Sequence, residues 1–298
     1  MRRILKTLGT GRYWYDELLP YWHEGADYTW TKLDLQEGDN EIYVYYGSST
    51  ATDESDGDSV FEFFDDFEGT ELDTTKWQEW AANISISSSV ITCWDGDVNL
   101  CAKGTGEGGV VPTLQTWWLR YRGKSYSDYS RWGCTYADTM VYTPDYTKFY
   151  EGSDDQWTSL LGTGEHSGLA NNDVYNWYVM DLIFDGSEGR FYFNGTLRAS
   201  RSMTDKTLTE VKLYSCRRYA YDWVLLCKYD IGEPTVSYGS EEAGSWTIDG
   251  HTFTKRKKVT ITSSQSVEGY QVRLSYSQWN DPNLRIWHRV LRYIRGDF

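Results

Sequence analysis

The chain has 298 residues, a formal net charge of −15 and an aromatic content of 17%. This length suffices for one large or two modest domains with cores of their own. The negative charge argues against nucleic acid and anionic lipid as partners, and no apolar run approaches the ~18 residues of a membrane span, so no membrane insertion is expected.

The first ten residues, MRRILKTLGT, start with basic side chains, but their apolar run is too short for a signal peptide. Two explanations stay open. Either a leader has been removed, or export occurs by another route, such as release with a virion. We expect an extracellular, cell-surface or virion location.

Three segments follow one another along the chain. Residues 1–59 contain a strand-like aromatic stretch and a polar, acidic connector. Residues 60–242 form a series of short strands punctuated by turns, which is typical of a β-sandwich. After a linker at 241–245, residues 246–298 include Lys257–Leu274, which predicts two alternating strands joined by a polar turn.

The two ends of the chain differ in charge. Residues 13–60 carry one basic and 12 acidic residues, whereas residues 246–298 carry nine basic and four acidic ones. The ends are therefore electrostatically complementary, which orients docking more than it adds affinity. The alternative is that both are solvated faces.

The middle segment contains a hairpin pattern in NWYVMDLIFDGSEGRFYFNGTL (176–197), where apolar residues alternate and Asn194-Gly195 supplies a tight turn. This stretch resembles the hairpin of laminin-G-like, concanavalin A-like domains. Residues 63–77 and 221–242 resemble the opening and closing stretches of such domains. The resemblance implies a jelly-roll β-sandwich.

The flanks resemble a second family, a prokaryotic domain of unknown function that often precedes a concanavalin A-like domain in secreted proteins. LLPYWHE (18–24), IYVYYG (42–47) and DGDSVFEFF (56–64) resemble its second half, and KKVTITSSQSVEGYQVRL (257–274) resembles its first half. The halves occur here in reversed order. The resemblance implies a smaller β-sandwich built from the N- and C-terminal segments.

Half a β domain leaves strand edges that invite a complementary strand. Three outcomes stay open: the chain's own ends pair, the tail of one subunit completes the head of the next, or the gene is truncated or rearranged and the ends of the protein are frayed. The second outcome would give a filament or a ring. The side chains expected at this seam are Lys257, Val259, Ile261, Tyr270, Val272, Leu274, Ile42 and Val44.

Concanavalin A-like folds also include glycosidases, and the laminarinase type carries E-x-D-x-x-E on one strand. Retaining chemistry needs two carboxylates about 5 Å apart, and that motif is absent from the sequence. Asp181 and Asp185 share strand parity, but Asp185 is expected in the hairpin turn. The sequence therefore favours a protein that is not an enzyme.

Sugar binding is the other function that the resemblance implies, because exposed aromatic rings stack on sugar faces. Trp117 and Trp118 would point to opposite faces of a strand, so at least one of them is expected in the core. The glycan-binding candidates are Trp117, Trp118, Tyr121, Tyr126, Tyr129, Tyr150 and Trp157.

No cofactor is certain. Calcium is the one candidate, bound by oxygen ligands in two acidic stretches, and the alternative is that both are solvated turns. The ligand candidates are Asp56, Asp58, Asp65, Asp66 and Glu68. Among the five cysteines, Cys93 with Cys101 and Cys216 with Cys227 are candidate disulfides, or all are buried thiols.

The sequence thus predicts an all-β protein: a concanavalin A-like jelly roll plus a second, smaller β-sandwich from the two ends. The expected function is that of a non-enzymatic extracellular or virion-surface structural protein that polymerises head to tail by strand complementation. Its partners would be copies of itself or other surface proteins. The alternatives are a lectin-like adhesion module that binds polysaccharide and, less favoured, a glycoside hydrolase.

Overall fold

The computed structural model describes residues 3–8, 12–25, 27–79, 83–94, 98–126, 132–135, 148–151, 157–161, 164–166, 175–202, 207–215, 218–230, 232–275, 277 and 289–295, in part by backbone only. The chain divides into two compact units. One combines Met1–Phe61 with Gly232–Phe298, and the other is Glu62–Ile231. We call them the small and the large sandwich. No helix in the described residues is long and apolar enough to cross a membrane.

The small sandwich consists of two antiparallel sheets, sheet A and sheet B. Sheet A contains, in spatial order, β1 (Arg3–Leu8), β2 (Arg12–Leu19), β24 (Arg289–Arg295), β5 (Gly38–Tyr46), β22 (His251–Ser263) and β21 (Thr235–Ile248). Sheet B contains β23 (Val267–Ser275), β4 (Tyr28–Leu35) and β3 (Tyr21–Glu24). A short helix, α1 (Gly57–Val60), follows, with Asp56 as its N-cap.

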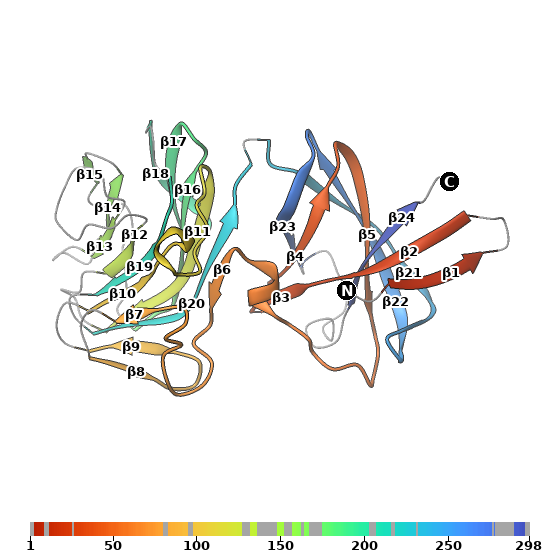
Figure 1. Ribbon diagram of the computed structural model, residues 1–298, viewed down its shortest axis with the longest axis horizontal. Coiled ribbons are helices and arrows are strands. Elements are labelled where there is room, and N and C mark those ends of the chain that lie inside the picture. Colours follow the sequence, from red (N-terminus) through yellow and green to blue (C-terminus); the bar gives the residue numbers. More distant parts are fainter. Residues whose placement is uncertain are drawn as a thin grey trace. The chain divides into compact units, whose positions relative to one another are not determined.

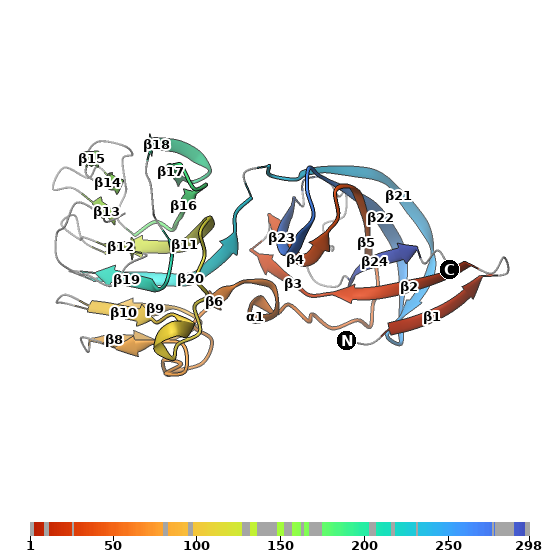
Figure 2. The ribbon, with the colours of Figure 1, turned by 45° about the horizontal axis from the view of Figure 1, so that its top comes forward.

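Strands from the two ends of the chain alternate within this unit, as the interleaved red and blue strands of Figures 1 and 2 show. β22 pairs with β5 from Lys255↔Tyr46 to Ser263↔Gly38, and β23 pairs with β4. The chain's own ends therefore build one sandwich together. This confirms the predicted fold class, in which the N- and C-terminal segments form a second, smaller β-sandwich.

The side chains expected at the seam occupy the core of the small sandwich. Alternate residues of β5 and β22 face sheet B, because successive side chains in a strand point to opposite faces. The apolar seam residues lie in this core, 0–6% exposed, and come from both ends of the chain: Ile42, Val44, Val259, Ile261, Tyr270, Val272 and Leu274. Lys257 pairs with Val44 in the same ladder.

The stretch 241–245, which reads as a linker in the sequence, lies inside β21 in the structure. β21 pairs with β22 with register shifts between Tyr238 and Glu241 and between Ala243 and Trp246. Its other edge has no neighbour in the described sheet order. Bulges and charged side chains on such an edge hinder pairing with another chain.

The large sandwich is built on two further sheets, C and D. Sheet C runs β18 (Thr196–Ser202), β17 (Glu188–Phe193), β16 (Tyr178–Phe184), β11 (Trp117–Ser125), β20 (Tyr219–Lys228), β9 (Ile91–Cys93) and β8 (Ile84–Ile86), and β6 (Phe63–Asp65) also pairs with β20. Sheet D runs β12 (Trp132–Thr135), β19 (Val211–Ser215), β10 (Val98–Ala102) and β7 (Gln78–Glu79). A further meander holds β13 (Lys148–Glu151), β14 (Trp157–Leu161) and β15 (Gly164–His166), and η1 (Thr105–Glu107) is a single 3₁₀ turn.

The core of the large sandwich lies between sheets C and D. Leu119 and Leu226 from sheet C pack in one cluster with Leu100 and Leu213 from sheet D, each at most 1% exposed. The predicted hairpin at 176–197 is present as β16, β17 and the start of β18. Its Asn194-Gly195 turn has φ values of 45° and 73°, as a two-residue hairpin turn of this kind requires.

Candidate functional site

Strand β11 presents two chemically different faces. Leu119 and Tyr121 are fully buried in the core between the sheets, and Gly123 follows on the same face, where an added Cβ would lie 2.3 Å from the hydroxyl oxygen of Tyr219. The alternate residues therefore point away from this core. They are Trp118, Arg120, Arg122 and Lys124. This outward face of sheet C is the candidate site.

One end of the outward face is a buried ion pair. The Arg120 guanidinium donates to the Asp181 carboxylate, and both side chains are at most 6% exposed. The indole Nε1–H of Trp118 donates to the same carboxylate oxygen at 2.6 Å. Because each charge has its partner, the pair is compatible with burial. The hydrogen bond to Asp181 fixes the position of the Trp118 ring. The Arg120 Cζ lies 5.8 Å from the centroid of this ring.

A β-bulge follows next to this pair. Arg122 pairs with Trp223 and Gly123 with Tyr221, so Asp222 is the extra residue on β20. The Asp222 carboxylate accepts from the Arg122 guanidinium. A bulge changes the direction of side chains at this point of a strand. Here it brings the Asp222 carboxylate next to the Arg122 guanidinium.

Beyond the bulge, cations and aromatic rings alternate. Arg122 lies over the Trp177 ring, with its Cζ 4.9 Å from the centroid. The Lys124 Nζ lies 4.5 Å from the centroid of the Trp177 ring and 4.8 Å from that of Tyr126. Arg218 continues the series, because its Cζ is 4.2 Å from the centroids of both the Tyr126 and the Trp94 rings.

We call this group the aromatic–cation row. Tyr175 extends it, with its ring edge-on to Tyr126 at 5.8 Å between centroids. The members of the row are Trp94, Arg122, Lys124, Tyr126, Tyr175, Trp177 and Arg218. Trp94 and Tyr175 are 41% and 64% exposed. Exposed rings held in a contiguous group mark a binding surface more often than scattered ones do.

Hydrogen bonds hold two residues of the row, Trp94 and Tyr126. The indole Nε1–H of Trp94 donates to the Ser85 hydroxyl at 2.9 Å, and its backbone N–H donates to the Asn83 carbonyl. The backbone N–H of Tyr126 donates to the Arg218 carbonyl. Each cation–ring contact adds about 0.5–1 kcal/mol at exposed positions. A surface that is ordered before its ligand arrives loses less entropy on binding.

The structure corrects part of the predicted glycan-binding set. Trp117 and Tyr121 lie in the core, 2% and 0% exposed, so they are closed to a ligand. Trp118 points outward, as the alternation requires, and Tyr126 belongs to the row. Tyr129 lies outside the described residues. Tyr150 and Trp157 are in β13 and β14, where only the backbone is described.

Sequence reasoning missed Trp94, Tyr175, Trp177 and Arg218. They come from three segments that meet only through the pairing of β11 with β16 and β20 and of β20 with β9. One signal was present. In RYRGKSY (120–126), basic residues and a tyrosine recur at every second position, which places them on one face of a strand.

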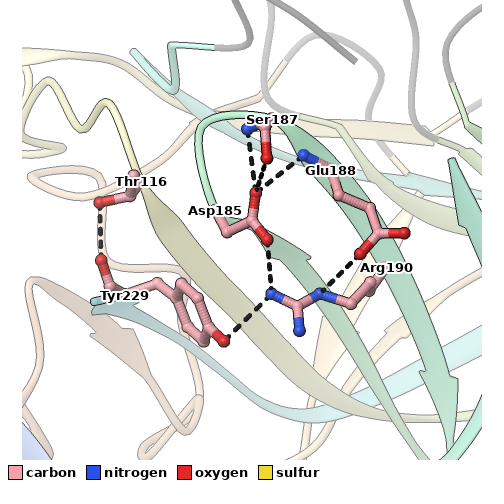
Figure 3. Close-up of polar contacts among 6 residues, drawn as sticks. All are labelled: Thr116, Asp185, Ser187, Glu188, Arg190 and Tyr229. Atoms are coloured by element: carbon pink, nitrogen blue, oxygen red, sulfur yellow. Dashed lines mark hydrogen bonds and ion pairs between the residues drawn. The ribbon is translucent and has the colours of Figure 1, made fainter. Parts of the chain in front are cut away.

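The Asp185 carboxylate lies in the turn between β16 and β17 and accepts several hydrogen bonds there, as Figure 3 shows. Its carboxylate accepts from the backbone N–H groups of Ser187 and Glu188 at 2.9 and 2.8 Å, and from Arg190 Nη2 at 2.9 Å. Burial raises the pKa of Asp185, but these donors outweigh it and hold the pKa below its ordinary value. Arg190 also donates to the Tyr229 hydroxyl. This carboxylate shapes a turn, as predicted.

The acidic calcium candidates do not form a cluster. Asp56 accepts from Ser59 as a helix cap, and Asp65 accepts from the Phe67 backbone and the Trp77 indole. Burial, followed by the charge of Glu68, raises the pKa of Asp66 to about 6. Over the described ranges, no group of three or more His, Cys, Asp or Glu side chains is arranged to hold a metal ion. Asp58 lies in α1.

The candidate disulfides are also corrected. Cys93, Cys101 and Cys227 are buried thiols, and the Cys101 Sγ–H donates to Glu210 at 3.7 Å. Burial and the negative charge of Glu210 raise the pKa of Cys101 to about 12. Cys216 lies outside the described residues. The alternative reading, buried thiols, holds for the described three.

A family model described as "Domain of unknown function (DUF2341)" matches residues 13–80. This stretch includes the N-terminal segment that resembles a prokaryotic domain of unknown function. The likeness of residues 257–274 to the other half, and with it the reversed order, stays a prediction. None of the curated proteins matches the chain.

Several solved structures are similar to the chain. A β-glucanase from Bacillus licheniformis is 14% identical and covers 56% of this chain and 98% of its own, with a TM-score of 0.43. A non-specific endo-β-1,3(4)-glucanase from family GH16 is 8% identical (64% and 95% covered, TM-score 0.46). A GlcNAcα1-4Gal-releasing endo-β-galactosidase from Clostridium perfringens is 12% identical (64% and 76% covered, TM-score 0.43). Because these TM-scores are below 0.5, the fold is assigned from the chain's own strands and cores.

Proposed function

We propose that the protein is a non-enzymatic carbohydrate-binding protein whose ligand lies along the aromatic–cation row. The observation that carries this proposal is the contiguous group of aromatic rings on the outward face of sheet C, of which Trp94 and Tyr175 are exposed and Tyr126 and Trp177 are half-buried. The C–H faces of a sugar ring are apolar and match the flat face of an aromatic side chain, while the polar tips of Tyr and Trp remain available to hydroxyl groups. Trp94 and Tyr175 offer the largest exposed area.

We favour binding over glycoside hydrolysis because the sequence lacks the E-x-D-x-x-E motif of laminarinase-type enzymes. A glycosidase needs one carboxyl group that carries a proton and a second that is ionised, on opposite sides of the scissile bond. On the outward face, the carboxylates of Asp181 and Asp222 each accept from an arginine. Within the protein, both carboxylates therefore serve as hydrogen-bond acceptors for an arginine.

A binding experiment tests the proposal. Affinity electrophoresis against a panel of neutral and acidic polysaccharides should retard the protein, and Trp177→Ala and Trp94→Ala should each remove the retardation. Tyr43→Ala is the matched control, because Tyr43 also stacks on an arginine, Arg256, but in the small sandwich. Retardation that survives both tryptophan changes, or no retardation by any polysaccharide, would refute the proposed site.

An assay for chemistry completes the test. Incubation with the same polysaccharides should release no reducing ends above the level of heat-treated protein. Release of reducing ends above that level would instead identify a glycosidase.

Head-to-tail assembly remains a prediction. In the described chain, β22 lies between β5 and β21, so a tail donated to a neighbour would first have to leave its own ladder. Light scattering at high protein concentration tests this: large particles would support assembly, and a uniform monomer would refute it. The proposed binding function keeps the extracellular or virion-surface setting expected from the sequence, because polysaccharides are met there.

A further inference from the structure

The aromatic–cation row contains two cations that no carboxylate of the described residues neutralises. Among the described residues, no carboxylate lies within ion-pair distance of Lys124 or Arg218. Both cations contact the Tyr126 ring, at 4.8 and 4.2 Å from its centroid. The two charges are therefore at most 9.0 Å apart, close to the ~8 Å screening length of physiological salt, and they repel each other.

The small sandwich shows what a structural cation–ring stack looks like in the same chain. The Arg256 Cζ lies 4.7 Å from the Tyr43 centroid and 4.9 Å from that of Trp246. Its Nε and Nη2 also bind the Glu242 carboxylate at 2.8 and 2.7 Å. The stack on Arg256 is thus neutralised within the protein.

Arg218 likewise lies over one tyrosine and one tryptophan ring, but no carboxylate of the described residues binds it. Its Nε is buried and has no hydrogen-bond partner within the described part of the chain. A buried donor without an acceptor is costly, and an anion at this position would satisfy it. The same anion would relieve the repulsion between Arg218 and Lys124. Both observations indicate a negatively charged group as part of the ligand.

We propose that the aromatic–cation row binds an acidic polysaccharide, whose carboxylate or sulfate group lies between Lys124 and Arg218 while its sugar rings stack on Trp94 and Trp177. This inference rests on the proposed function and specifies its ligand class. A sparsely charged glycan suits a protein with a net charge of −15 better than a nucleic acid does, because duplex DNA carries a charge every ~1.7 Å along its axis.

The test compares polymers that differ only in charge. Isothermal titration would use polygalacturonate with its carboxyl-reduced derivative, and carrageenan with its desulfated derivative. At least one acidic polymer should bind about tenfold or more tightly than its neutral counterpart, as expected for a charge-assisted hydrogen bond. The arm with the larger difference identifies carboxylate or sulfate. Added salt should weaken only the acidic partner's binding.

Variants locate the effect. Lys124→Gln and Arg218→Gln should each lower affinity for the acidic polymer about tenfold and lower affinity for the neutral derivative much less, while Lys124→Arg should retain binding. Lys258→Gln, which removes an exposed cation paired with Glu41 in the small sandwich, is the matched control. Circular dichroism would verify that each variant is folded. If Arg218→Gln unfolds, the comparison of Lys124→Gln with Lys124→Arg still tests the inference.

Four outcomes would overturn the inference. Equal affinity for the acidic and neutral polymers, with loss in Trp177→Ala, would refute the acidic ligand and leave the proposed function standing. Acidic binding that is unchanged in Lys124→Gln and Arg218→Gln would place the anion elsewhere. Tighter binding of a single-stranded oligonucleotide than of either acidic polysaccharide, or no polysaccharide binding at all, would refute both proposals.

Discussion

The two sandwiches differ in how their strands come together. The large one is made from a continuous stretch, Glu62–Ile231, whereas the small one joins two segments from opposite ends of the chain. In the small sandwich, hydrogen bonds connect residues as far apart in sequence as Asp39 and Thr262. Closing a long loop costs little more than closing a medium one, since the cost grows with the logarithm of length. Stability therefore tolerates this arrangement, provided that both segments are present.

Removal of residues 232–298 should have the largest effect. The small sandwich would lose β21, β22, β23 and β24 and with them five of the twelve buried residues of its main core cluster, so its unfolding transition should disappear. The large sandwich, whose strands all lie in 62–231, should keep its own transition. Differential scanning calorimetry of the shortened chain measures this, with the isolated 62–231 fragment as the reference. Loss of both transitions would show that the two units fold as one.

Asp181→Ala should destabilise the large sandwich by about 3–5 kcal/mol, because it leaves the buried Arg120 guanidinium without its carboxylate. Chemical denaturation followed by tryptophan fluorescence gives the value. The double change Arg120→Met with Asp181→Leu should cost far less, since no buried charge remains. A single variant as stable as the parent would mean that the pair is hydrated.

Ile261→Ala should cost the small sandwich about 2–5 kcal/mol, because the side chain is fully buried between sheets A and B. Leu119→Ala, equally buried, should cost a similar amount in the large sandwich. Each change should lower the midpoint of its own transition only. A midpoint shift in both transitions from either change would overturn the picture of two independent cores.

Asp66→Asn should produce the smallest effect, and only above about pH 4. The folded-state pKa of Asp66 is about 6, above its ordinary value of 3.8, so the folded large sandwich binds this proton more tightly than the unfolded chain does. Its stability should therefore fall as the pH rises from about 4 to 6 and stay level above.

The asparagine variant should lack that fall and gain ~1 kcal/mol at pH 7, a value reduced for screening of a partly exposed group. Thermal unfolding between pH 4 and 7 provides the measurement. A parallel pH dependence in the parent and the variant would assign the effect to another group.

The fold was largely predictable because alternation is a local property. The pattern in 176–197 predicted a hairpin and its Asn194-Gly195 turn, and both are present. The site was not predictable in the same way. Trp94, Trp177 and Arg218 are adjacent only because β11 pairs with β16 on one side and with β20 on the other, and the bulge at Asp222 shifts the register between them.

The second feature that the sequence did not predict was which face of a strand is buried. Trp117 and Trp118 are the same type of residue and are neighbours in sequence, yet Trp117 packs in the core and Trp118 points outward. Alternation stated that their faces differ, but the choice of face depends on the opposing sheet, which comes from residues such as Leu100 and Leu213. The structural role of Asp65 likewise depends on a tertiary contact, the hydrogen bond from the Trp77 indole.

The in-chain pairing of β5 with β22 has a consequence for the time course of synthesis. Asp39 leaves the ribosome 223 residues before its partner Thr262, an interval on the order of 10–45 s at cellular translation rates. During that interval β2, β4 and β5 lack their C-terminal partners β24, β23 and β22, while the whole of the large sandwich is synthesised. Order of emergence, rather than distance in the finished structure, thus makes the N-terminal strands the part of the molecule most in need of protection by a chaperone.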